Sequence, residues 1–199
     1  MSSNVRYSAD LTAGSLKIRE SRIIADLLLK GVSDDEFRNL IVVKNILQMR
    51  SPSSAVRLAK LIRSRLIKMN SDHWVMVRDG DQSLASQALL VAAVKHSALL
   101  RDFLNLALRT EYRLLHTQLL PAVWSQFLVE CESRSHLVSQ WSESTRKRLR
   151  SSVFQILSQA GYVGARPGNE LKKFVVLPEI SDYLSRSGEN TLLQSLQMP

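Results

Sequence analysis

The sequence predicts a mainly α-helical protein, in which an N-terminal helical bundle is followed by a winged-helix-like C-terminal unit with one small β-hairpin. Three observations support this prediction. Apolar residues recur at spacings of three and four through most of the chain, which is the period of an amphipathic helix. Serine, aspartate, proline and glycine stand where those helices would begin and end. After residue 160 the pattern changes to β-forming residues around the turn-forming run RPGN.

Capping residues mark the first two helices. A helix expected over residues 15–30 ends at Gly31, since glycine readily adopts the left-handed conformation that follows a helix. Ser33 and Glu36 then form a capping box, the pattern in which each side chain bonds the other residue's backbone N–H. A second helix is therefore expected to run to about residue 47.

Three more helices follow before residue 97. Pro52 opens a helix expected over residues 52–69, because its missing N–H costs nothing in a first turn. A short helix begins near Ser71. Asp81 caps a very apolar helix, QSLASQALLVAAV, which we expect to be buried on most sides because it lacks a polar face.

The C-terminal part predicts a different order of elements. We place a domain boundary near residue 118, which gives domains of residues 1–118 and 119–199. Three helices and a hairpin in sequence are typical of a winged helix-turn-helix, whose third helix enters the major groove of DNA. A helix over residues 97–115 is expected before the boundary. In the C-terminal unit the three helices are expected over residues 121–132, 135–141 and 145–160, and Pro178 opens one more, over residues 178–186, after the hairpin.

Composition narrows the functional classes. The net charge is +9, which favours a polyanionic partner. Cys131 is the only cysteine, so an internal disulfide and a cysteine-rich zinc site are excluded, and a reducing compartment fits. The longest apolar run covers residues 88–94, whereas a membrane span needs roughly 18 residues. The sequence therefore predicts a soluble cytoplasmic protein with no membrane partner.

The patterns of common catalytic and metal sites are missing from the sequence. The four histidines are far apart, and no glycine-rich phosphate loop, dinucleotide fingerprint or nucleophile elbow occurs. Cys131 lies between two glutamates, which raise rather than lower the pKa of a thiol. We expect no catalytic residue, no metal and no cofactor.

Positive charge is concentrated in two stretches. Residues 44–68 carry a net charge of +7 with no acid, and residues 144–173 carry +6, so the rest of the chain is net negative by four charges. A local concentration of cations indicates a nucleic-acid surface more strongly than the total charge does.

The first stretch predicts a basic stripe on the helix over residues 52–69. Spacings of three, four and four put its polar residues on one side, opposite an apolar face, and flexible cations in a row suit a phosphate backbone. The alternative is an ordinary solvated helix face. The candidate nucleic-acid-binding residues here are Arg57, Lys60, Ser64 and Lys68, with Arg65 beside them.

The second stretch predicts a recognition helix and a basic wing. The apolar residues of helix 145–160 face one way and its hydrogen-bonding side chains face the other. Lysine or arginine can read guanine, and glutamine can read adenine, in a major groove. The alternative is a winged helix used for protein contact. The candidates are Arg146, Lys147, Arg148, Arg150, Ser151 and Gln155 on the helix, with Arg166, Lys172 and Lys173 on the wing.

Several long segments resemble the BrxA family of BREX phage-exclusion systems. They are YSADLTAGSLKIRESRIIADLLLKG, FRNLIVVKNILQ, SPSSAVRLAKLIRSRL and the end GYV…LPEISDYL. The resemblance implies a cytoplasmic, nearly all-helical protein with a bundle similar to NusB. It also implies double-stranded DNA binding without catalysis, beside the methyltransferase, phosphatase-like and ATPase components of BREX. It assigns no DNA-contact residues, so the candidates above depend on charge and helical geometry alone.

The sequence thus predicts a non-enzymatic protein that binds double-stranded DNA mainly through its phosphates. Two alternatives stay open. The basic faces could dock acidic proteins of the defence complex, or the likeness to an antitermination factor could indicate RNA binding.

Overall fold

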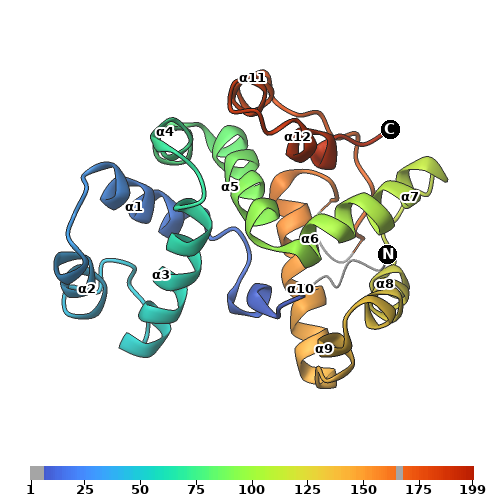
Figure 1. Cartoon of the computed structure of the whole chain (residues 1–199), viewed down its shortest axis with the longest axis horizontal. Helices are drawn as coiled ribbons and strands as arrows, with labels where there is room; N and C mark the ends of the chain where they lie inside the picture. The colour runs from blue at the N-terminus through green and yellow to red at the C-terminus, as the bar shows by residue number, and fades with distance from the viewer. Residues whose placement is uncertain (1–6, 165–167) are drawn as a thin grey trace. The chain divides into compact units, whose positions relative to one another are not determined.

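The computed structural model describes residues 7–164 and 168–199, and all regular elements within them are helical (Figure 1). The chain divides into two compact units. The N-terminal unit is Leu16–His96, and the C-terminal unit combines residues 7–15 with Ser97–Pro199. The domain boundary predicted near residue 118 stays a prediction about independent folding, which compactness alone does not test.

Five helices form the N-terminal unit. Helix α3 contacts α1, α2 and α5, and α4 contacts α1 and α5. Every residue of α5 from Ala85 to Val94 is buried, which confirms the prediction that this apolar helix is enclosed on most sides. The helices are α1 (Ile18–Leu29), α2 (Asp34–Val42), α3 (Pro52–Leu66), α4 (Ser71–Asp79) and α5 (Gln82–His96).

The predicted caps position these helices. The Ser33 hydroxyl accepts a hydrogen bond from the N–H of Glu36 at 3.2 Å, and Asp81 accepts one from the N–H of Leu84 at 2.8 Å. Gly31 has φ of +63°, as expected of a residue that ends a helix in the left-handed region. These local bonds satisfy backbone groups that a helix end otherwise leaves unpaired.

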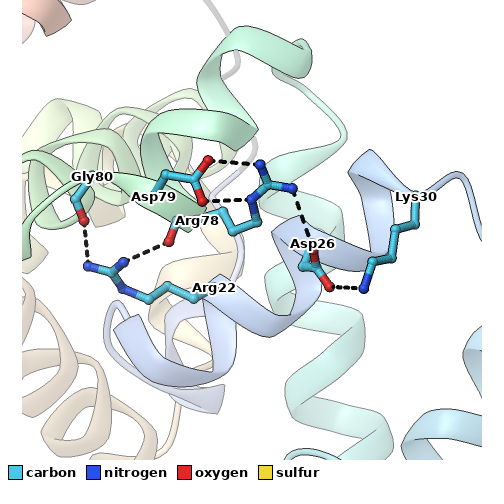
Figure 2. A network of polar contacts seen from close by, with 6 residues as sticks. All are labelled: Arg22, Asp26, Lys30, Arg78, Asp79 and Gly80. Atoms are coloured by element: carbon cyan, nitrogen blue, oxygen red, sulfur yellow. Dashed lines mark hydrogen bonds and ion pairs between the residues drawn. The ribbon is translucent and has the colours of Figure 1, made fainter.

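Polar contacts join α1 to the end of α4, and Figure 2 shows them from close by. Arg22 donates to the carbonyl oxygens of Arg78 and Gly80, both at 2.7 Å, so its guanidinium caps the last carbonyls of α4. Asp26 accepts from Lys30 at 2.7 Å and lies 3.5 Å from Arg78. The two ion pairs are partly exposed and contribute little to stability, whereas the capping of α4 fixes where the helix ends.

The C-terminal unit holds the remaining helices. Its core contains three aromatic rings, those of Phe103, Trp124 and Phe127, with centroids 5.2–5.8 Å apart. The elements are η1 (Asp10–Ala13), α6 (Ala98–Asp102), the π-helical η2 (Phe103–Leu108), α7 (Arg109–Arg113), α8 (Pro121–Arg134), α9 (His136–Ser139), α10 (Glu143–Ala160), α11 (Pro178–Arg186) and α12 (Asn190–Leu196). Because α6, η2 and α7 follow without a break, the single helix predicted over residues 97–115 is confirmed.

Helix α10 is the longest element of this unit. The Ser142 hydroxyl accepts from the N–H of Thr145 at 3.3 Å, and Gly161, with φ of +98°, ends the helix. Its predicted apolar face is confirmed, since all five predicted side chains are buried: Leu149, Val153, Ile156, Leu157 and Ala160. The opposite face is consequently held toward solvent.

The predicted β-hairpin is wrong, although the mainly α class is confirmed. Among the described residues after α10 no strand forms, and only isolated antiparallel bridges pair Val163 with Leu171 and Glu170 with Gln118. Beyond Lys172 the bridge does not extend, because the N–H of Tyr162, which would pair with the Lys172 carbonyl oxygen, donates instead to the carbonyl oxygen of Leu157 at 2.9 Å. Aromatic packing also competes with alternation, because the Phe174 ring stacks on that of Tyr162 at 3.7 Å between centroids.

Within the described part of the chain, no single helix is both long and apolar enough to cross a membrane; α5 and the helix after it reach that length only if joined across the break at Ser97.

Candidate nucleic-acid interface

The basic stripe of α3 is present but shorter than predicted. Arg57 and Lys60 are exposed, and Ser64 is half-buried with its hydroxyl donating to the Leu61 carbonyl oxygen at 2.8 Å. These three positions follow one another at spacings of three and four, so they share one side of the helix. The stripe therefore offers two cations directly to solvent from the helix itself.

Lys68 is exposed but lies in the turn after the helix. The helix predicted to residue 69 ends at Leu66, whose carbonyl oxygen accepts a hydrogen bond from Trp74 Nε1 at 2.8 Å. Asn70 then caps α4 by accepting from the N–H of His73 at 3.2 Å. Because the next helix starts there, the chain turns before Lys68 can extend the stripe.

Arg65 is placed differently from the other candidates on α3. It is only 3% exposed, so a duplex docked on the stripe would not reach its guanidinium in this conformation. Helical spacing alone does not indicate this burial, because the position lies between the apolar and the polar sides of the helix.

Arg63 contacts two residues that lie outside the basic stretch of residues 44–68. Its guanidinium lies 2.6 Å from a carboxylate oxygen of Asp34 and 4.6 Å from the ring centroid of Phe37, both on α2. The absence of acids between residues 44 and 68 therefore does not leave every cation there unpaired. The acid comes from the preceding helix, which only tertiary packing brings within reach.

Arg146 on α10 holds the unit together. It pairs with Glu132 of α8 at 2.6 Å and donates to the carbonyl oxygens of Val138 and Trp141, both at 3.1 Å. Its side chain is 24% exposed. We assign it a positioning role, because these three contacts fix α10 against α8, against α9 and against the segment that follows α9.

The rest of the polar face of α10 is open to solvent. Arg148, Ser151 and Gln155 are exposed, and Arg150 is half-buried. Lys147 is exposed and lies 3.5 Å from Glu143, one turn earlier on the same helix. An exposed pair of that kind is worth about 0.3–0.5 kcal/mol and leaves the lysine able to exchange partners.

The lysines after α10 are also exposed. Lys172 and Lys173 stand where the segment leaves its bridge with Val163. Arg166, the predicted tip of the wing, lies outside the described residues. The structure thus brings the exposed candidates of the second stretch together in one unit: Lys147, Arg148, Ser151 and Gln155 on the helix, and Lys172 and Lys173 beyond it.

Two buried titratable side chains have pKa values that burial shifts away from neutral pH. Burial raises the pKa of the Cys131 thiol to about 12, so the thiol is protonated at neutral pH and is a poor nucleophile. Burial lowers the pKa of His73 to about 4, and its Nε2 lies 2.8 Å from the Ala88 carbonyl oxygen. Since a carbonyl only accepts, Nε2 carries the proton of a neutral ring. No three metal-ligating side chains gather among the described residues.

A family model described as BrxA matches residues 5–188. This chain belongs to the BrxA family. It is similar to the BREX protein BrxA of Paramagnetospirillum magneticum (strain ATCC 700264 / AMB-1), with 42% identity over 97% of both chains. It is also similar to the BREX protein BrxA of Escherichia coli O9:H4 (strain HS), with 33% identity over 96% of this chain and 90% of that one.

A solved structure has the same fold as this BrxA-family chain. It is described as the crystal structure of an uncharacterized protein from Magnetospirillum magneticum. The TM-score is 0.89 at 40% identity, over 97% of this chain and 99% of that one. The family assignment made from the sequence segments is confirmed over nearly the whole chain.

Proposed function

We propose that this BrxA-family chain is a non-enzymatic, double-stranded DNA-binding component of its BREX phage-defence system. It would bind mainly through phosphate contacts and act in the cytoplasm beside other BREX proteins, the methyltransferase, phosphatase-like and ATPase components among them. Membership of the family supports the place in BREX. DNA binding is inferred from the charged surfaces.

The observation that carries DNA binding is the outer face of α10. Arg148, Ser151 and Gln155 are exposed at spacings of three and four, while the opposite face is anchored in the core. A helix held rigidly from behind can present cations to phosphates and hydrogen-bonding side chains to base edges. The exposed Lys172 and Lys173 of the same unit add cations for the backbone.

The surface on α3 supports the same function less strongly. It offers Arg57 and Lys60 on the helix and Lys68 in the turn, and none of these three has an ion-pair partner among the described residues. Such cations would release counterions from phosphates without reading sequence. We therefore expect α10 to supply any sequence preference and α3 to supply general affinity.

The experiment is a fluorescence-anisotropy titration of labelled random duplex, about 24 base pairs long, at about 50 and 200 mM salt, with RNA as competitor. With six or more phosphate contacts, affinity should fall roughly 1000-fold between the two salt concentrations. Single-stranded DNA and RNA of equal length should compete poorly.

The matched control for a charge reversal on α10, such as Arg148→Glu, is Arg113→Glu, which changes the net charge by the same amount at an exposed position on α7. It should leave duplex affinity within about twofold. An affinity that stays flat with salt, or RNA that competes as well as duplex, would contradict the proposal; the second result would favour RNA binding.

A further inference from the structure

A groove runs between α2 and α3 in the N-terminal unit, and the two helices lie side by side in Figure 1. Its volume is about 680 Å³. Ile41 and Ala59 form a buried floor, and Phe37 is half-buried at one side. The floor and walls are mainly apolar, although α3 also carries the basic stripe.

Two exposed apolar side chains line this groove, one from α3 and one from the turn directly after it. Val56 is 46% exposed and Ile67 is 58% exposed, and both line the groove. Lys60 and Arg63 lie between them in the sequence, so the four residues follow at spacings of four, three and four and form a row along the groove. This row has an apolar residue at each end and two cations in the middle.

The rim of the groove is positively charged. Arg38 from α2 faces Lys60 and Arg63 from α3. The acid that reaches this rim in the described chain is Asp34, which is 83% exposed and pairs with Arg63. An apolar groove with cations along its rim is complementary to an amphipathic helix whose apolar face is flanked by acidic residues.

We propose that the α2–α3 groove binds an acidic amphipathic helix of a partner protein. The apolar residues of that helix, at i, i+3 or i+4 and i+7, contact Val56, Ile67 and Phe37. Its carboxylates pair with Arg38, Lys60 and Arg63. Helix α3 has 15 residues, about 22 Å at 1.5 Å per residue, which accommodates roughly three to four turns of a partner.

Arg63 would change partners when the helix binds. In the free protein its guanidinium covers the Phe37 ring at 4.6 Å and pairs with the exposed Asp34. A carboxylate of the incoming helix can replace that of Asp34 at little cost, because one exposed ion pair is exchanged for another. The exchange also uncovers the Phe37 ring for apolar contact. Asp34 therefore competes with the partner for Arg63.

Duplex DNA is a poorer match for the groove. A duplex gains affinity from cations and polar donors, whereas exposed valine and isoleucine are stabilised by apolar partners. The groove and the DNA surface on α3 share Lys60 and Ser64 but differ at Val56 and Ile67, so mutations at the latter two positions can distinguish the two kinds of ligand.

The test begins with a library of random peptides, about 16 residues long, displayed on yeast. It is selected on the full-length protein and counter-selected on Val56→Asp. The selected peptides should be rich in Asp and Glu, with apolar residues at helical spacing. A selection that yields basic peptides, or none that distinguishes the two proteins, would overturn the proposal.

The best selected peptide is then titrated by fluorescence anisotropy. Val56→Asp and Ile67→Ser should each weaken binding at least tenfold, and Val75→Asp should not. Val75 is 41% exposed on α4 of the same unit, so it is a matched control for an added surface charge. Circular dichroism would verify that all three variants are folded.

Asp34→Asn gives an independent test of the partner exchange. It should strengthen peptide binding two- to fivefold by releasing Arg63, whereas Asp35→Asn, in the same first turn of α2, should not. Weaker binding by Asp34→Asn would contradict the exchange.

The variant Val56→Asp also distinguishes other occupants of the groove. If it abolishes duplex binding, the groove serves nucleic acid. If it abolishes self-association in sedimentation, the occupant is a second copy. Either result would overturn the proposal.

Discussion

Helices α3 and α10 were predicted from the same kind of pattern, a basic face opposite an apolar face, yet the cations of the two helices have different surroundings in the structure. On α3, Arg65 is buried and Arg63 is engaged by Asp34 and Phe37 of the neighbouring helix. On α10 the cation removed from the surface is Arg146, which binds Glu132 and two backbone carbonyls.

The difference lies in what borders each polar face. The face of α10 is lined by other polar side chains, among them Ser151 and Gln155, which can hydrogen-bond to a polar ligand. The face of α3 borders an apolar groove with Val56 and Ile67 at its edge. Equal charge density in a sequence therefore does not imply equal function, because the neighbours of a cation decide what it can bind.

The largest expected difference between the two units is the dependence of their stability on pH. His73 lies buried in the N-terminal unit, whereas His116 and His136 of the C-terminal unit are exposed. Its folded pKa of about 4 lies below the unfolded value of 6.5. Between these values the unfolded state binds the proton and the folded state does not, so stability falls as pH falls. We expect a loss of roughly 3 kcal/mol between pH 7 and pH 4.

Urea denaturation at several pH values measures this loss, and His73→Gln is the comparison. The variant lacks the titrating ring, so its pH dependence should be flatter by most of that amount. Parallel curves for the two proteins would mean that other groups are responsible.

Charge reversal on the α10 surface should have the largest effect on DNA. Lys147→Glu, Arg148→Glu and Lys172→Glu together should weaken duplex binding roughly 100-fold at about 100 mM salt, and the salt slope should fall by about one for each phosphate that is no longer neutralised. Anisotropy against a random duplex measures both quantities. A change below threefold would mean that α10 is not part of the interface.

The substitutions Ser151→Ala and Gln155→Ala remove only a few atoms and no charge. They should alter any preference among sequences more than overall affinity.

Arg146 and Arg148 offer a comparison within one helix. Arg146→Ala should lower the free energy of unfolding by about 2 kcal/mol, because it removes the donor of the Glu132 carboxylate and of the Trp141 carbonyl oxygen, and one of the donors of the Val138 carbonyl oxygen. Arg148→Ala should change it by less than about 0.5 kcal/mol, since its side chain is exposed. Urea denaturation at neutral pH distinguishes them, and equal losses would contradict the positioning role of Arg146.

The smallest effect is expected from the stripe on α3. Arg57→Glu, Lys60→Glu and Lys68→Glu together should weaken duplex binding roughly tenfold, and all sequences should be affected alike. A set of duplexes of different sequence tests that uniformity. Strong discrimination among sequences would instead mean that α3 reads bases.

Much of the fold followed from local rules. The caps at Ser33 and Asp81 and the stop at Gly31 act within one turn of chain, so the sequence displays them directly. The apolar faces of α5 and α10 were also predicted correctly. The hairpin was not, because the N–H of Tyr162 that would have continued it donates to Leu157 at the end of α10.

By itself, the sequence determined the helical class, the concentration of charge in two stretches and the membership of the BrxA family. All three depend on composition, spacing or long matching segments. Only the tertiary structure decided which cations remain exposed. Asp34 of α2 pairs with Arg63, 29 residues later in the chain, and Glu132 of α8 pairs with Arg146 of α10. Such contacts depend on how helices pack rather than on neighbours in the chain. The apolar groove beside α3 has the same origin, since two separate helices must meet to form it.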